Sequence, residues 1–136
     1  MLEDSPVTQK LITKMLEKSG LSVTSVSNQE EFWGHLNNNL PDLILMDVIL
    51  TDGNGKKVVQ ELQRDIRFKK IPIIFVTNTL DIHSDDGYAA FDVNGTAYRA
   101  FAKPLHFPKL ISVIKKEINR VVEGHGPLPA KIKKVQ

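Results

Sequence analysis

One stretch of the chain limits the possible folds more than any other. Four large apolar residues, Leu43-Ile44-Leu45-Met46, stand between Asp42 and Asp47. An apolar run without polar alternation is typical of a strand buried on both faces, as in a parallel sheet covered by helices. Asp47 would then stand at the carboxyl end of a central strand, the edge where open α/β sheets collect ligands. The alternative is an aspartate that only begins the next turn.

Composition excludes several classes of protein. With 136 residues, of which 41% are hydrophobic and 25% charged, the chain has the size of one domain with one core. A net charge of +2 is too small to indicate direct nucleic-acid binding. The lack of cysteine excludes disulfides and thiolate metal sites and favours a cytoplasmic location. No apolar run approaches the roughly 20 residues that span a bilayer, so we expect a soluble protein without a membrane partner.

Hydrophobic periodicity predicts an alternation of strands and helices. Strands are expected over residues 21–26, 42–47, 71–77 and 97–102. Helices are expected over residues 6–19, with Ser5 as its cap, 28–36, with Ser27 as its cap, 56–70, 85–93, which is short and weak, and 107–122. This alternation predicts an α/β three-layer sandwich with parallel strands and right-handed crossovers.

Polar residues gather at the carboxyl edge of the predicted sheet. Glu3 and Asp4 stand just before the first helix, Asp47 and Thr77 end strands, and Lys103 follows the last strand. Three crowded carboxylates repel one another unless a cation lies among them, and oxygen ligands favour a hard ion such as Mg²⁺. Thr77 could hydrogen-bond to a phosphoryl group on Asp47, and Lys103 could form an ion pair with it. The set is therefore suited to phosphorylation of a carboxylate.

Four motifs together resemble the response-regulator receiver domain, the CheY-like module of two-component signalling. They are Glu3-Asp4-Ser5-Pro6, the run from Pro41 to Asp47, the run from Ile71 to Thr77, and Lys103-Pro104. The resemblance covers residues 1 to about 122. It implies a flavodoxin-like doubly wound fold with a five-stranded parallel sheet in the order 2-1-3-4-5. We expect a receiver domain over residues 1–123, followed by a linker and basic tail over residues 124–136.

The resemblance also implies roles for the edge residues. Asp47 would accept a phosphoryl group from a histidine kinase or phosphotransfer protein. Glu3, Asp4, Asp47 and the backbone carbonyl of Ile49 would hold Mg²⁺. Thr77 and Lys103 would sense the phosphoryl group. The protein would be a signalling switch that promotes its own phosphorylation and dephosphorylation rather than an enzyme in the usual sense.

The output side of the switch departs from the family pattern. The family usually carries an aromatic residue three positions before the lysine, where this chain has Ala100, so Phe101 and Tyr98 are the alternatives. By resemblance, the Lys103–Pro104 peptide bond is expected to be cis, a form that proline makes accessible. Phosphorylation would repack the surface of the fourth helix, fifth strand and fifth helix. A homodimer is a further candidate assembly.

Two other functions are alternatives to a phosphorylated receiver. Asn78 stands where the family usually has a small residue, so a pseudo-receiver that is never phosphorylated and acts in docking or dimerisation is an alternative. A flavodoxin-like electron carrier would share the architecture. It needs a hydroxyl- and glycine-rich phosphate loop after the first strand, whereas Asp4-Ser5-Pro6 places acid there.

The first strand is the largest departure. Only Met1 and Leu2 precede the acidic pair, whereas a strand in the middle of this sheet needs ~5 residues. The tail, residues 131–136, read straight into Met1-Leu2-Glu3-Asp4 looks like an intact first strand. We therefore hypothesise a permuted chain whose tail fills this slot, within the chain or by exchange with a neighbour. The alternative is a disordered basic tail.

Overall fold

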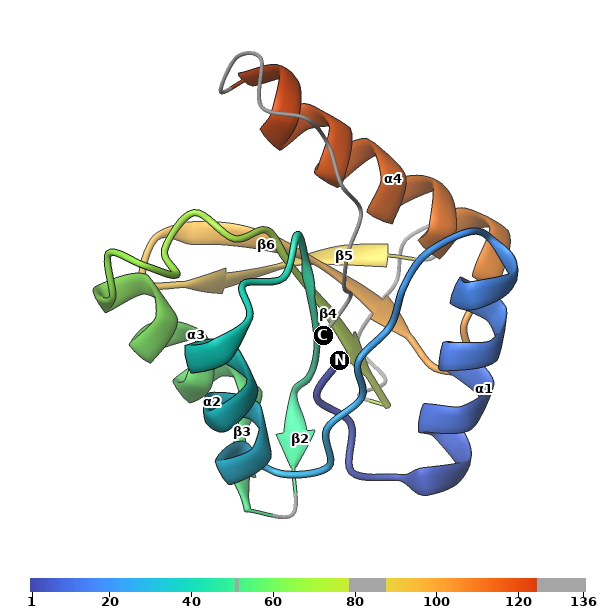
Figure 1. Ribbon diagram of the computed structural model, residues 1–136, viewed down its shortest axis with the longest axis horizontal. Coiled ribbons are helices and arrows are strands. Elements are labelled where there is room, and N and C mark those ends of the chain that lie inside the picture. The colour runs from blue at the N-terminus through green and yellow to red at the C-terminus, as the bar shows by residue number, and fades with distance from the viewer. Residues whose placement is uncertain (51, 79–87, 125–136) are drawn as a thin grey trace.

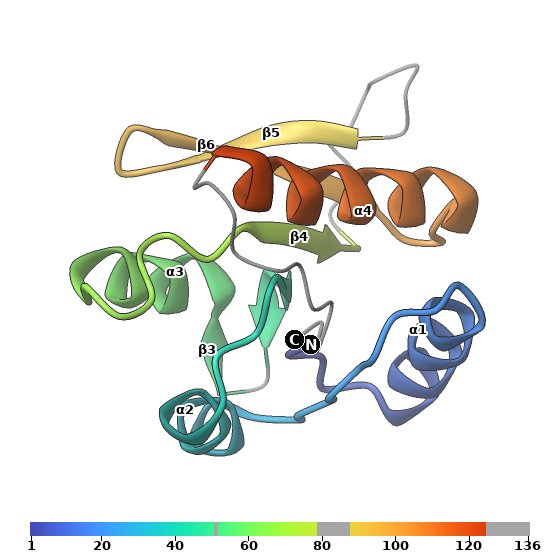
Figure 2. The same ribbon diagram turned by 45° about the horizontal axis from the view of Figure 1, so that its top comes forward.

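The computed structural model describes residues 1–50, 52–78 and 88–124. A central sheet is covered on one face by helices α1 (Pro6–Lys18) and α4 (Phe107–Gly124). The helices α2 (Gln29–Asn38) and α3 (Gly55–Arg64) cover the other face (Figures 1 and 2). The predicted three-layer α/β sandwich is confirmed. None of the helices in the described ranges has the length and apolar character of a bilayer span.

Parallel strands form the middle of the sheet. Strand β1 (Ile44–Asp47) pairs with β4 (Ile73–Thr77), and β4 pairs with β6 (Thr96–Ala102). The strand β5 (Tyr88–Val93) runs antiparallel to β6, which gives the order β1-β4-β6-β5. Two short strands after Asp47, β2 (Ile49–Leu50) and β3 (Gly53–Asn54), form a separate antiparallel pair.

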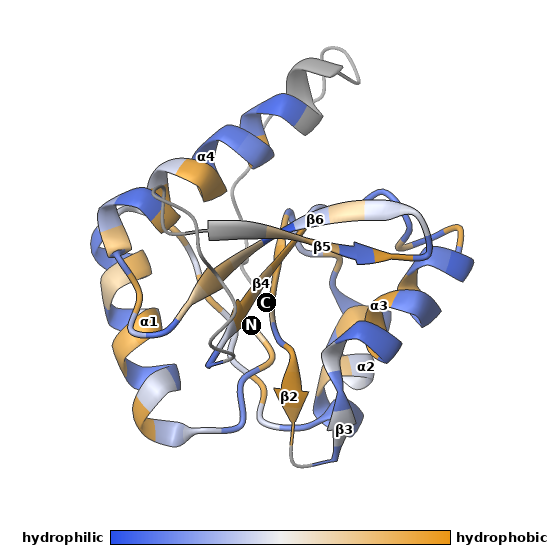
Figure 3. Ribbon diagram, turned by 180° about the vertical axis from the view of Figure 1, so that it is seen from behind, coloured by the Kyte–Doolittle hydropathy of each residue, from blue (hydrophilic) through white to orange (hydrophobic). Residues whose placement is uncertain are grey.

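Strand β1 is buried on both faces, as its sequence predicts. Leu45 packs in the core beneath α1 and α4. Its neighbours Ile44 and Met46 pack in the core beneath α2 and α3. Figure 3 shows hydrophobic residues along β4, whereas α3 and α4 alternate between hydrophobic and hydrophilic residues. A strand between two apolar layers needs apolar side chains in both directions, which explains the unbroken run.

The N-terminal residues lie inside the sheet layer. Leu2 forms parallel bridges with Val26 on one side and with Met46 on the other, and both Met1 and Leu2 are fully buried. Of the strand expected over residues 21–26, the described structure retains only isolated bridges. The tail proposed to complete this slot lies outside the described residues, so that hypothesis and the domain boundaries stay predictions.

The helix expected over residues 85–93 is wrong, because residues 88–93 form strand β5. Asn94 and Gly95 form a two-residue turn between β5 and β6, with φ of 51° and 85°. Positive φ at both turn positions is the type I′ geometry that matches the twist of a hairpin, and Asn-Gly is its strongest sequence signal. The mostly parallel sheet therefore has an antiparallel strand at its margin, and the surface expected around a fourth helix here is instead a hairpin.

The helix caps agree with the sequence at α1 and differ by one residue at α2. Ser5 Oγ accepts from the backbone N–H of Thr8, and Pro6 begins α1 as predicted. Helix α2 is capped by Asn28 rather than Ser27, because Asn28 Oδ1 accepts from Glu31 N at 2.9 Å. Asparagine and serine are equally good caps, so the local pattern could not distinguish the two positions.

Candidate functional site

The acidic residues from two distant parts of the chain converge at the carboxyl edge of the sheet. Carboxylate oxygens of Glu3, Asp4 and Asp47 all lie within 4.8 Å of one another. They border a cavity of about 300 Å³. The residues that line this cavity are Glu3, Asp4, Ser5, Thr8, Asp47, Ile49, Asn78 and Lys103.

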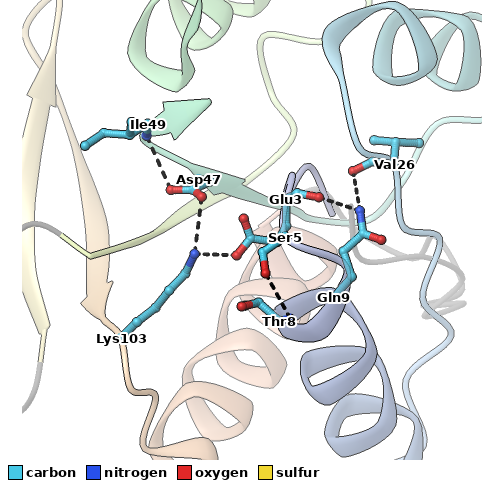
Figure 4. A network of polar contacts seen from close by, with 8 residues as sticks. All are labelled: Glu3, Ser5, Thr8, Gln9, Val26, Asp47, Ile49 and Lys103. Atoms are coloured by element: carbon cyan, nitrogen blue, oxygen red, sulfur yellow. Dashed lines mark hydrogen bonds and ion pairs between the residues drawn. The ribbon is translucent and has the colours of Figure 1, made fainter. Parts of the chain in front are cut away.

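Lys103 joins the two buried carboxylates (Figure 4). Its Nζ donates to Asp47 Oδ2 at 3.2 Å and to Glu3 Oε1. The Lys103 side chain is only 11% exposed, and that of Glu3 is fully buried. Charged groups are tolerated at this depth only when they are paired, so the ammonium group is needed to keep both carboxylates in the site.

Asp47 is held from several directions. Its backbone N–H donates to Leu2 O at 3.1 Å, and its Oδ1 accepts from Ile49 N at 3.3 Å. Gly55, the first residue of α3, lies so close that a Cβ there would be 2.1 Å from Asp47 O. Only glycine therefore lets α3 begin against the end of β1. The carboxylate is fixed by the strand, the N-terminal segment and the start of a helix.

Glu3 has an oxygen that the protein leaves unsatisfied. Its Oε2 is buried and has no hydrogen-bond partner among the described residues. Burial raises the pKa of Glu3, and the adjacent Asp47 carboxyl raises it further, while Lys103 acts in the opposite direction. An unpaired buried acceptor costs about 1–3 kcal/mol, which a bound cation would offset. Three carboxylates and the nearby Ile49 backbone fit the all-oxygen ligand set that Mg²⁺ prefers.

Gln9 fixes the backbone of Glu3 from the first turns of α1. Its Nε2, which carries two hydrogens, lies within hydrogen-bonding distance of the backbone oxygen of Glu3, of Val26 O at 3.0 Å and of Ser27 Oγ at 3.1 Å. Figure 4 shows the amide between the Glu3 and Val26 segments. Sequence reasoning missed this residue, because a glutamine on a helix carries no signal that it bonds to backbone groups elsewhere.

Thr77 and Asn78 both reach this edge, with different surroundings. Thr77 ends β4, is fully buried, and its backbone oxygen accepts from Lys103 N at 2.9 Å. Asn78, the next residue, lines the cavity. The structure thus brings every predicted edge residue to one end of the sheet, with Asn78 added to the cavity wall.

The two candidate switch aromatics lie on opposite faces of β6. Phe101 is buried in the core beneath α1 and α4. Tyr98 packs on the other face, 5.9 Å from the Phe75 ring, and its hydroxyl accepts from Gln63 Nε2 at 2.8 Å. Ala100 between them is fully buried. The Lys103–Pro104 peptide bond is cis, as the resemblance implied.

The family model described as the response regulator receiver domain matches residues 1–115. The chain belongs to this family. The match includes every edge residue of the cavity, from Glu3 to Lys103. It therefore covers the sheet and the whole candidate site.

Individual relatives of this receiver domain are similar to it at moderate identity. Response regulator Rre1 of Synechocystis is 31% identical over 78 residues, covering 57% of this chain but only 34% of Rre1. The polar-differentiation response regulator DivK of Brucella anthropi is 29% identical and covers 85% of this chain and 90% of DivK. The chain therefore spans about a third of Rre1 and most of DivK.

Solved structures agree with this family. The receiver domain of the sensor histidine kinase PA1611 from Pseudomonas aeruginosa superimposes with a TM-score of 0.70 at 25% identity. The superposition covers 87% of this chain and 93% of that domain. The structure of that domain is described with a magnesium ion coordinated in its active-site cleft.

Proposed function

We propose that Asp47 accepts a phosphoryl group from a phosphohistidine of a partner histidine kinase or phosphotransfer protein. The observation that carries this proposal is the convergence of Asp47, Lys103 and two further carboxylates on one cavity. A buried carboxylate on a rigid strand end is suited to act as a nucleophile, because its position is fixed before the partner arrives. Membership in the receiver family supports the same role.

The residues of the cavity would divide the chemistry among them. A carboxylate oxygen of Asp47 attacks phosphorus in line with the departing imidazole nitrogen. The new O–P bond forms as the P–N bond breaks, which leaves an acyl phosphate on Asp47 and a free imidazole on the partner. Glu3, Asp4, Asp47 and the Ile49 carbonyl would hold Mg²⁺, which when bound neutralises charge on the phosphoryl oxygens. Lys103 then changes partners from the Asp47 carboxylate to the new phosphoryl group. Thr77 would sense the same group from the end of β4 and pass the change to the sheet.

Exposed apolar residues on α1 and at the cavity lining support docking of a partner protein. Val7 and Leu11 on α1 are 78% and 52% exposed, and Ile49, which lines the cavity, is 61% exposed. Large apolar side chains exposed near a reactive group favour a protein–protein contact there. A phosphohistidine carried by that partner would reach Asp47 through the cavity.

Phosphorylation by a small phosphodonor tests the proposal directly. Incubation with acetyl phosphate and Mg²⁺ should add one phosphoryl group, measured by intact-mass spectrometry, and Asp47→Asn should abolish it. Asp52→Asn is the matched control, because Asp52 is exposed and bonds to Gln29 N outside the cavity. It should be phosphorylated like the unaltered protein. If neither acetyl phosphate nor beryllofluoride produces any Mg²⁺-dependent change, the proposal is wrong and a docking module is the better reading.

A further inference from the structure

Strand β5 forms one margin of the sheet. The strand order places β6 on one side of it, and within the described part of the chain no strand pairs with its other side. Figure 2 shows β5 at the upper margin of the sheet, with α4 crossing the face in front. An edge strand presents backbone N–H and C=O groups that can pair with another chain.

The turn geometry identifies the residues that present these groups. In a turn such as Asn94-Gly95, the C=O of the residue before it accepts from the N–H of the residue after it, which makes Val93 and Thr96 a hydrogen-bonded pair. Hydrogen-bonded and non-bonded pairs alternate along an antiparallel ladder. The backbone groups of residues 89, 91 and 93 therefore point to β6, and those of residues 88, 90 and 92 point to the open edge.

Most of the usual protections of an edge strand are missing from β5. Its sequence, Tyr-Ala-Ala-Phe-Asp-Val, contains neither lysine, proline nor glycine. Its register with β6 continues from Tyr88 to Val93 without a bulge. Ala90 and Asp92 are exposed, and Asp92 is the single charge on the strand. Edge strands in monomers commonly carry such blocking features.

We propose that β5 pairs in antiparallel fashion with β5 of a second copy of this chain, about a twofold axis at Ala90. Residue 90 of one copy would face residue 90 of the other, and residue 88 would face residue 92. Each facing pair exchanges two backbone hydrogen bonds. The sheet would then continue across the dimer. This proposal does not depend on phosphorylation of Asp47.

A second copy fits this edge for reasons of symmetry and charge. An antiparallel strand pairs with itself under a twofold axis, so the same surface serves both copies and the assembly closes as a dimer. The residue on the axis is alanine, whose small side chain leaves room for close approach. In this register the charge of Asp92 lies opposite residue 88 and not opposite its own copy, so like charges do not face each other.

Charge exchange at the axis provides the sharpest test. Ala90→Lys and Ala90→Glu each place like charges opposite each other, and each variant alone should sediment as a monomer in analytical ultracentrifugation. A mixture of the two variants should form a heterodimer, because the charges across the axis are then opposite. The unaltered protein should be a dimer at high concentration. A protein that stays monomeric, or an Ala90→Lys variant that dimerises as the unaltered protein does, would overturn the proposal.

A proline at residue 90 tests edge pairing independently of the folding of the hairpin. Ala90→Pro removes an N–H that points to the open edge and leaves the β5–β6 ladder intact, which edge strands tolerate. The variant should be a monomer with an unchanged circular dichroism spectrum, whereas Ala90→Ser should remain a dimer. An Ala90→Pro variant that still dimerises would contradict the proposal. Because Asp47→Asn should leave the dimer unchanged, failure of this proposal is distinguishable from failure of phosphorylation.

Discussion

At the scale of single residues, the acidic cluster is a balance between paired and unpaired charge. Lys103 neutralises Asp47 and one oxygen of Glu3, while the other oxygen of Glu3 has no partner among the described residues. The sequence predicted Glu3, Asp4, Asp47 and Lys103, because the ends of parallel strands meet at one edge. It did not predict Gln9, whose partners are backbone oxygens that the three-dimensional fold brings to it.

Replacement of Gln9 should weaken both folding and cation binding. Gln9→Met keeps the shape of the side chain but removes the donors to Glu3 O and Val26 O. We expect a loss of about 1–2 kcal/mol in the free energy of unfolding, measured by urea denaturation. Mg²⁺ should also raise the melting temperature less than in the unaltered protein, because Glu3 is held less firmly.

Lys10→Met is the control for this change. Lys10 is the next residue on α1 and is exposed, so its replacement introduces the same side chain without removing the hydrogen bond to Glu3 O. It should leave the Mg²⁺ response intact. An equal loss of that response in both variants would show that Gln9 does not position Glu3.

At the scale of elements, the hairpin of β5 and β6 is the main difference from the sequence expectation. The segment before Asn94 contains apolar and small residues that suit a weak helix, and Gly87 already argued against a long one. In the structure, Phe91 packs 5.8 Å from the Phe75 ring, and Lys56 Nζ lies 4.5 Å above the Phe91 ring. These contacts with β4 and α3 favour the strand. Helix propensity is a property of the local sequence and therefore does not include them.

Two glycine replacements should change stability in opposite directions. Gly95 has φ of 85° and no atom within 4 Å of an added Cβ, so Gly95→Ala should lose about 1 kcal/mol through backbone strain alone. Gly34 lies inside α2, also with open space around an added Cβ. Gly34→Ala should gain about 0.5–1 kcal/mol. Urea denaturation of both variants checks this prediction, and a neutral Gly95→Ala would argue against the type I′ turn.

At the scale of the whole molecule, the ammonium group of Lys103 joins segments that are far apart in the chain. Lys103 is 100 residues from Glu3 and 56 residues from Asp47, and it contacts both. The N-terminal segment also enters the sheet layer through the bridges of Leu2. The site therefore depends on complete folding of the domain, and folding in turn depends on charge balance within the site.

Loss of the Lys103 ammonium group should be compensated in part by a bound metal ion. Lys103→Met leaves buried carboxylates without their cation, so in the presence of a chelator the variant should lose about 3 kcal/mol in the free energy of unfolding. Mg²⁺ should then stabilise the variant more than it stabilises the unaltered protein, because it replaces the missing positive charge. Thermal melts with and without Mg²⁺ measure the difference.

The matched control for Lys103→Met is Lys116→Met, an exposed residue of α4 away from the lining of the cavity. Its response to Mg²⁺ should equal that of the unaltered protein. If Lys103→Met gains no additional stability from Mg²⁺, the three carboxylates do not form a cation site.

The sequence by itself determined the layers and the functional edge. Unbroken apolar runs specify strands buried on both faces, and helical periodicity specifies the helices that cover the sheet. Because the strands are parallel, their carboxyl ends bring Asp47, Thr77 and Lys103 to one edge. The tertiary structure alone decided that residues 88–93 form an edge strand and that Gln9 fixes Glu3. Local patterns express the preferences of a segment for helix, strand or turn. Contacts between distant segments decide among these preferences, and they exist only after the chain has folded.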